Sequence, residues 1–316
     1  MQHTTSTAQP DTPHTPRRKG ISPEAVLGLI ALLAAAAFVC MVILCLPYLP
    51  TRTADDPEEL VRHRQINTLP TRAPSDPEPT QPATEPLEEG PLPEANPYGN
   101  LDFQYNQNNY LYCLQQDSFP GVDVSAFQGD IDWQQVKDSG IRFAILRIGY
   151  RGYESGKLVE DEYIRQNLEK TAEVGLPIGV YFFSQALTVK EVDQEIEFML
   201  EILGDRELEM PIVLDWEIPT ADARTAKMDA DTLTELQTHF CTTMEEKGYT
   251  PMIYFNWHQS NTLLHLTDLE RWPFWLALYS DRMTYPHHVE LWQYTDQGKV
   301  PGISGNVDLN LYIPKV

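Results

Sequence analysis

Pro-Ile-Val-Leu-Asp-Trp-Glu, residues 211–217, is a short apolar run that ends in two acids. Its length and its β-branched residues are typical of a strand that is buried on both faces of a parallel sheet. Residues two apart on a strand point to the same side, about 7 Å apart at a rise of ~3.3 Å per residue. Asp215 and Glu217 are therefore expected to face one cavity.

Seven further apolar runs surround this one and are also expected to be strands: residues 121–125, 143–149, 178–184, 252–257, 274–279, 289–294 and 307–312. Amphipathic helices separate the earlier runs. Strands that alternate with helices predict a parallel sheet, and eight strands are enough to close a barrel. Helical patterns become short after residue 252. The sequence therefore predicts an α/β fold, an irregular TIM-like barrel of about eight strands and five helices over residues 118–316.

Three of the helix boundaries have local signals. Thr188 with Glu191 has the spacing of a capping box, and so has Thr232 with Glu235, which predicts a helix start at each threonine. Gly175 follows a helical pattern and is expected to end that helix.

The segment from Ala25 to Leu46 contains 22 residues without a charge. At ~1.5 Å per residue, a helix of this length spans a ~30 Å hydrocarbon core. The apolar part of a cleaved signal peptide is shorter, at roughly 7–15 residues. Basic residues 17–19 precede the segment and acids follow it. We therefore expect a cytoplasmic tail over 1–24, a single transmembrane helix over 25–46 in the cell membrane, and an extracytoplasmic domain beyond it.

The segment over residues 47–117 is acidic and rich in proline, with nine prolines between residues 70 and 97. It has few large apolar residues to offset the entropy of ordering, and proline favours extended conformers. The sequence predicts a disordered linker. It could hold the following domain away from the bilayer or serve only as a spacer.

Composition limits the class of protein. Hydrophobic residues make up 42% of the chain, enough for a buried core, and the formal net charge is −23. Such a charge argues against nucleic acid or an anionic membrane surface as the main partner.

Two more acids lie in predicted strands, Asp123 in residues 121–125 and Asp308 in residues 307–312. Strand interiors are depleted in aspartate, and reactive groups of parallel barrels gather where strands end. The four acids could form one site. Alternatively, they could cap neighbouring helices or bind Arg147 and Arg151.

Paired carboxyls at this spacing suit cleavage of a glycosidic bond, where one protonates the leaving oxygen and the other stabilises positive charge at the anomeric carbon. Like charge and desolvation should raise the pKa of one of the two, and the spacing does not say which. Six tryptophans lie within residues 118–316. They could stack on sugar rings or belong to the core.

Other chemistries have less support in the sequence. There is no Gly-x-Ser-x-Gly elbow, His-Glu-x-x-His helix, phosphate-binding glycine loop or Cys-x-x-Cys pair. We therefore expect no cofactor and no metal. Cys113 and Cys241 could pair outside the cell, or remain buried thiols.

Six motifs, in this order and spacing, resemble the lysozymes of glycoside hydrolase family 25: Gly-Val-Asp-Val-Ser-Ala-Phe-Gln-Gly-Asp-Ile-Asp-Trp (121–133), Phe-Ala-Ile-Leu-Arg-Ile-Gly-Tyr-Arg-Gly (143–152), Gly-Leu-Pro-Ile-Gly-Val-Tyr-Phe-Phe-Ser (175–184), the opening heptapeptide, Leu-Trp-Gln-Tyr (291–294) and Val-Asp-Leu-Asn (307–310). The resemblance covers roughly residues 119–314. It implies a modified barrel and an N-acetylmuramidase, which cleaves the β-1,4 bond between N-acetylmuramic acid and N-acetylglucosamine in peptidoglycan.

The resemblance also implies roles for individual residues. Glu217 matches the general acid, and Asp215 would assist the substrate N-acetyl group or act as the nucleophile. Asp123 and Asp308 match the other carboxylates of the cleft, Asp123 as a catalytic residue and Asp308 as a substrate-binding one. Four aromatic residues are expected to contact sugar: Tyr181, Tyr254, Trp275 and Trp292. The membrane segment and linker depart from relatives that carry a signal peptide and wall-binding repeats.

Two other functions remain open at this point. Chitinase-like barrels also end a strand in Asp-x-Glu, although the fuller Asp-x-x-Asp-x-Asp-x-Glu run is absent from this sequence. A catalytically silent barrel could instead bind glycan as a scaffold, although such a module has no need of a general acid. The expected partners are peptidoglycan strands and the membrane, with a monomeric catalytic domain.

Overall fold

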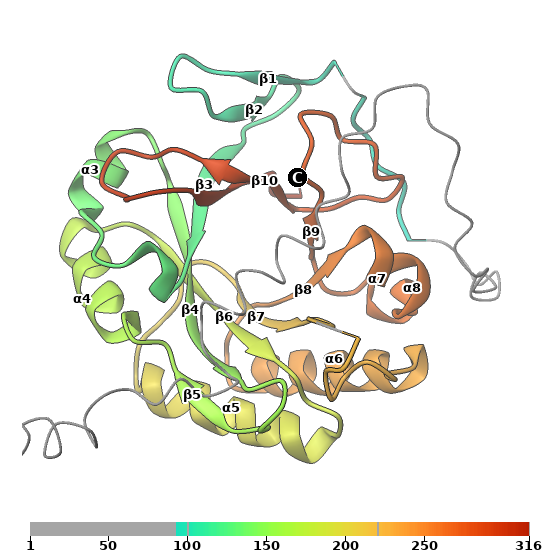
Figure 1. The fold of residues 1–316 in the computed structure, drawn as a ribbon. Helices are drawn as coiled ribbons and strands as arrows, with labels where there is room; N and C mark the ends of the chain where they lie inside the picture. Colours follow the sequence, from blue (N-terminus) through green and yellow to red (C-terminus); the bar gives the residue numbers. More distant parts are fainter. Residues whose placement is uncertain (1–92, 100, 220, 316) are drawn as a thin grey trace, which may run out of the picture. The chain divides into compact units, whose positions relative to one another are not determined.

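Eight strands close into a barrel in a computed structural model that describes residues 93–99, 101–219 and 221–315 (Figure 1). In chain order they are β3 (Phe119–Val124), β4 (Phe143–Arg151), β6 (Ile178–Ser184), β7 (Ile212–Trp216), β8 (Pro251–Asn256), β9 (Phe274–Ala277), β10 (Leu291–Gly298) and β11 (Val307–Tyr312). Strand β3 pairs with both β4 and β11, and this closes the sheet. The predicted eight-stranded α/β barrel is confirmed.

One strand of the barrel runs against the others. β11 is antiparallel to both of its neighbours, β10 and β3, whereas the other neighbouring pairs of the barrel are parallel. The beginning of β11 therefore lies at the edge where the parallel strands end. Asp308, near the start of β11, is in register with Asp123, near the end of β3.

Six α-helices occur in the described residues, where five were expected: α3 (Trp133–Asp138), α4 (Ile164–Val174), α5 (Val189–Leu203), α6 (Ala230–Glu246), α7 (Trp257–Thr262) and α8 (Leu266–Leu269). The helices after β8 are short, as predicted, so the helical cover is thinner there (Figure 1). Strand β5 (Leu158–Glu160) was not expected and pairs with β4. A 3₁₀ turn, η3 (Ala126–Gln128), follows β3.

The predicted helix boundaries have different outcomes. Gly175 ends α4 in a left-handed conformation, as expected, and Thr188 caps α5 by accepting from the backbone N–H of Glu191. The predicted start at Thr232 is wrong, because Asp229 caps α6 and accepts from the Thr232 backbone N–H at 2.8 Å. Aspartate is a better N-cap than threonine and adds a negative charge at the helix N-terminus.

Alternation along the strands separates the core into an inner and an outer layer. The inner cluster fills the barrel: Phe143, Ile145, Tyr181, Val213, Met252, Tyr254, Trp275 and Leu291. The outer cluster contains the intervening strand residues and the buried faces of the helices. A Cβ on Gly121 would lie 2.2 Å from the ring of Phe143, so only glycine lets that ring fill the barrel at this level.

The segment before the barrel corrects part of the predicted linker. Residues 93–99 and 101–117, which we call the strap, include a hairpin of β1 (Phe103–Tyr105) and β2 (Leu111–Cys113). The strap lies on the loop before β10, since the Asn96 backbone N–H donates to Pro286 O at 2.8 Å. The linker predicted over 47–117 is therefore folded in this part, because buried residues such as Phe103 and Leu111 offset the cost of ordering it.

Several predictions fall outside the described residues. They are the cytoplasmic tail over 1–24, the transmembrane helix over 25–46, and the linker over 47–92. Among the residues that are described, none of the helices has the length and hydrophobicity needed to cross a bilayer. Cys113 and Cys241 are both buried free thiols.

Candidate active site

The four predicted acids lie at the edge where the parallel strands end. On β3 and β11, the residues on either side of Asp123 and Asp308 belong to the outer core cluster, so these two aspartates point into the barrel. All four acids are nearly buried, with exposed fractions of 1% for Asp123, 2% for Asp215, 6% for Glu217 and 5% for Asp308.

Trp216 fixes the direction of its two acidic neighbours. Its ring lies in the outer core, and its Nε1–H donates to the backbone oxygen of Ala186 at 2.8 Å. Because side chains alternate along a strand, Asp215 and Glu217 point to the inner side. That the two carboxyl groups face one cavity stays a prediction.

Glu217 is held by a tyrosine from the neighbouring strand. The hydroxyl of Tyr254, on β8, donates to Glu217 Oε1 at 3.0 Å. The Tyr254 ring packs edge-on against Trp275 with 5.0 Å between ring centroids, and Tyr181 packs edge-on against Trp275 at 6.2 Å. Three of the predicted aromatic residues therefore form one cluster beside Glu217.

Asp123 is held by two side-chain amides that the sequence analysis missed. Gln293 Nε2 and Asn310 Nδ2 both donate to Asp123 Oδ2, at 2.7 and 2.8 Å. Asn310 Oδ1 in turn accepts from Trp275 Nε1–H at 2.9 Å. Two donors on one carboxylate oxygen fix the direction of the Asp123 side chain. Gln293 lies in the 291–294 motif two residues after Leu291, and Asn310 lies in the 307–310 motif two residues after Asp308. Since Leu291 and Asp308 point into the barrel, strand alternation could have identified both amides.

The family model of "Glycosyl hydrolases family 25" matches residues 122–303, which include Asp123, Asp215 and Glu217. This chain belongs to glycosyl hydrolase family 25. It is a glycosidase with the barrel that its motifs predicted.

Three relatives illustrate the extent of the likeness. The uncharacterized protein YegX of Escherichia coli O6:H1 is 30% identical over 203 residues, which are 61% of this chain and 68% of that protein. The autolytic lysozyme of Clostridium acetobutylicum is 24% identical over 193 residues, or 60% of this chain and 54% of that one.

The third relative is a solved structure, the modular autolysin LytC of Streptococcus pneumoniae in complex with a synthetic peptidoglycan ligand. It has a TM-score of 0.56 at 23% identity, over 66% of this chain and 50% of that chain. This chain thus spans about half the length of LytC. At this identity the comparison supports the fold.

Trp292 lies apart from the four acids. Its ring is fully buried in the outer core, 5.2 Å from the ring of Phe103 in the strap, and its Nε1–H donates to Leu278 O. Its neighbours Leu291 and Gln293 point inward instead. The position of Trp292 therefore argues against the predicted sugar contact, and alternation on β10 is the reason.

The two arginines bind other buried carboxylates. Arg147 Nε donates to Asp161 Oδ2 at 2.8 Å, and Arg151 Nε donates to Glu195 Oε1 at 2.6 Å. Burial raises the pKa of Glu195 to about 7, although Arg151 and Ser184 act against this rise. These contacts favour the reading of the four acids as a site over the alternative in which they serve as partners for the arginines.

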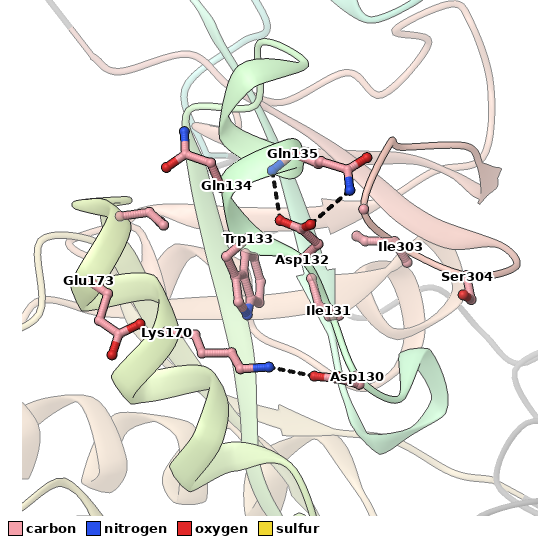
Figure 2. Close-up of a pocket in the computed structure, with 12 residues that line it drawn as sticks. Asp130, Ile131, Asp132, Trp133, Gln134, Gln135, Lys170, Glu173, Ile303 and Ser304 are labelled. Atoms are coloured by element: carbon pink, nitrogen blue, oxygen red, sulfur yellow. Dashed lines mark hydrogen bonds and ion pairs between the residues drawn. The ribbon is translucent and has the colours of Figure 1, made fainter.

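A surface cavity of about 580 Å³ lies on the flank of the barrel, between α3, α4 and the turn that joins β10 to β11 (Figure 2). Two of its acids bind neighbouring lining residues: Lys170 Nζ donates to Asp130 Oδ1 at 2.6 Å, and Gln135 Nε2 donates to Asp132 Oδ2 at 2.7 Å. None of the four acids lines it. Within the described part of the chain, no group of three or more His, Cys, Asp or Glu could hold a metal ion.

Proposed function

We propose that this chain is a membrane-anchored N-acetylmuramidase that cleaves the β-1,4 bond between N-acetylmuramic acid and N-acetylglucosamine in peptidoglycan. Membership of family 25 supports the proposal, as do the autolytic lysozyme and the peptidoglycan-bound autolysin among its relatives. The observation that carries it is the hydrogen bond from Tyr254 to Glu217, inside a barrel edge that holds three further acids.

Glu217 is the general acid in this proposal. It gives its proton to the leaving oxygen of the glycosidic bond. The Tyr254 hydroxyl orients the carboxyl group and stabilises the carboxylate that forms when the proton leaves, because hydrogen bonds to charged groups are the stronger ones. A group held in this way needs little reorganisation during the reaction.

Asp215 acts on the positive charge that develops at the anomeric carbon. It orients and stabilises the N-acetyl group of the substrate as this group attacks, or it attacks the carbon itself. Asp123, oriented by Gln293 and Asn310, lies on the same edge, and Asp308 lies beside it on β11. Tyr181, Tyr254 and Trp275 are nearly buried, so in this proposal only the edges of their rings reach the bottom of the sugar site.

The anchor is residues 25–46, with a cytoplasmic N-terminus and the barrel outside the cell membrane. The acidic chain is repelled by anionic wall polymers, so an anchor is the more effective means of retention. Carbonate extraction of membranes tests the proposal, since an anchored chain stays in the pellet. Protease added outside protoplasts should then remove the barrel, and a protected barrel would contradict the orientation.

Activity is tested with the full-length chain in detergent on purified peptidoglycan. New reducing ends that terminate in N-acetylmuramic acid, identified by product mass, are the expected result, and Glu217→Gln should abolish them. Equal activity of wild type and Glu217→Gln would contradict the assignment of the acid. Cleavage of chitin oligomers in place of peptidoglycan would favour the chitinase-like alternative, and binding without turnover would favour the scaffold.

A further inference from the structure

Glu217 comes directly after the last residue of β7, so its backbone is not part of the paired strand. On one side, the pairing of β7 with β6 ends at Trp216, which is in register with Ser184. On the other side, the pairing with β8 ends at Leu214, in register with Ile253. Trp216 therefore lies outside the ladder with β8, and Glu217 lies outside both ladders, just where the proposed acid must be placed accurately.

Two buried glutamines bind these peptide groups from the two neighbouring strand ends. Gln185, which directly follows β6, donates from Nε2 to the backbone oxygen of Glu217 at 2.6 Å. Gln259, on α7 after β8, donates from Nε2 to the backbone oxygen of Trp216 at 2.5 Å. The exposed fractions of these glutamines are 0% and 3%, so water does not compete for the carbonyls.

Each glutamine is itself held in one orientation. Gln185 Oε1 accepts from the hydroxyl of Thr225 at 2.9 Å, and its Nε2 also donates to Ser184 O at 2.9 Å. Gln259 Oε1 accepts from the backbone N–H of Asn256 at 2.9 Å, within the capping box of α7. With the oxygen of each amide committed as an acceptor, its nitrogen is directed to the β7 carbonyl.

We infer that Gln185 and Gln259 are positioning residues for Glu217, an inference that rests on the proposed role of Glu217 as the acid. They replace the missing sheet partners and prevent the peptide groups after β7 from rotating. A rotation there would move the carboxyl group away from Tyr254 and from the substrate. Displacement of a reacting group by about 1 Å costs on the order of 100-fold in rate.

Gln237 offers a matched control. It lies on α6, is 1% exposed, and donates from Nε2 to the backbone oxygen of Leu214 at 3.1 Å. The bond has the same chemistry as that of Gln185, on the same strand, but it acts within the sheet and three residues before the acid. Its loss should affect stability without moving Glu217.

The test compares Gln185→Met, which keeps the size of the side chain and removes its polar atoms, with Gln237→Met in the full-length chain. On peptidoglycan, Gln185→Met should lower kcat about 10- to 100-fold and leave KM within about 2-fold, since only transition-state contacts are lost. The alkaline limb of the pH–rate profile, which reports deprotonation of the general acid, should shift. Gln237→Met should keep the wild-type kcat and pH profile. Equal losses of kcat in the two variants would overturn the inference.

Thr225→Val provides a second variant, because it removes the hydroxyl that donates to Gln185 Oε1 at 2.9 Å and to the backbone oxygen of Glu217 at 3.3 Å. It should lower kcat less than Gln185→Met and in the same direction. Hydrogen exchange of the peptide that contains residues 216–219 gives a reading without turnover: exchange should be faster in Gln185→Met and unchanged in Gln237→Met. If wild type does not cleave peptidoglycan, the proposed function fails, and unchanged exchange in Gln185→Met would separately overturn the positioning role.

Discussion

The hydroxyl of Tyr254 donates a hydrogen bond to Glu217 Oε1 across 3.0 Å, and this bond joins the end of β8 to the residue that follows β7. Tyr254 is 4% exposed and is held by its edge-on contact with Trp275. The tyrosine ring is therefore fixed by packing, and its hydroxyl in turn fixes the carboxyl group. The orientation of the proposed acid therefore depends on β8 as well as on β7.

Replacing Tyr254 by Phe should lower kcat on peptidoglycan with little change in folding stability. Hydrogen bonds to charged groups contribute about 1.5–3 kcal/mol, which corresponds to a loss of about 10- to 100-fold in rate. Initial rates of reducing-end formation at several pH values measure it. Tyr312→Phe, at the opposite end of the barrel on β11, is the control and should keep full activity. Equal rates for Tyr254→Phe and wild type would show that the bond has no role in turnover.

Much of this site could be predicted from the sequence, because strand alternation and strand-end acids are local signals. Position in the predicted strands points to all four acids, Asp123, Asp215, Glu217 and Asp308, and the family resemblance adds their expected roles. Gln185 could not be identified, since its role depends on a contact with Glu217 that is remote in sequence. The strap was missed for a similar reason: Phe103 has no strong local pattern around it, and its partner Trp292 lies far along the chain.

Asn310→Ala should reduce both stability and activity. Asn310 donates from its side-chain amide to Asp123 and also accepts from the indole N–H of Trp275, so its removal leaves buried polar atoms short of partners. Each such atom costs about 1–3 kcal/mol. The midpoint of urea unfolding should fall, and kcat should fall with it because Asp123 loses its orientation. Asn261→Ala, on the exposed face of α7, is the control and should change neither quantity.

The pH dependence of stability should change in Glu195→Gln. The folded-state pKa of Glu195 is raised from 4.5 to about 7 by burial, so the native state holds its proton more tightly than the unfolded chain does. This contribution to the free energy of unfolding is complete below about pH 4.5 and is lost as the pH rises through about 7. Glutamine keeps an acceptor for Arg151 and cannot ionise. The variant should therefore gain stability relative to wild type between pH 5 and about pH 8.

Urea unfolding at a series of pH values measures this difference. Asp130→Asn is a control of opposite sign, because its hydrogen bond to Lys170 lowers the pKa of Asp130, an exposed carboxylate. The native contribution of Asp130 is present above the ordinary aspartate pKa and is lost only in more acidic solution. A difference between Glu195→Gln and wild type that stays constant from pH 5 to pH 8 would contradict the prediction.

Phe103→Ala should show that the strap contributes to folding stability and not to catalysis. The Phe103 side chain is 6% exposed and covers the ring of Trp292, so its truncation leaves a cavity and should cost about 3–5 kcal/mol of unfolding free energy. Tyr105→Ala, two residues along β1 and 47% exposed, should cost far less. Thermal unfolding measures both variants. Trp292 lies on the outer face of β10 and Gln293, which holds Asp123, on the inner face. We therefore expect the kcat of folded Phe103→Ala, measured well below its Tm, to match wild type, whereas a large loss of kcat there would mean that the strap also positions Asp123.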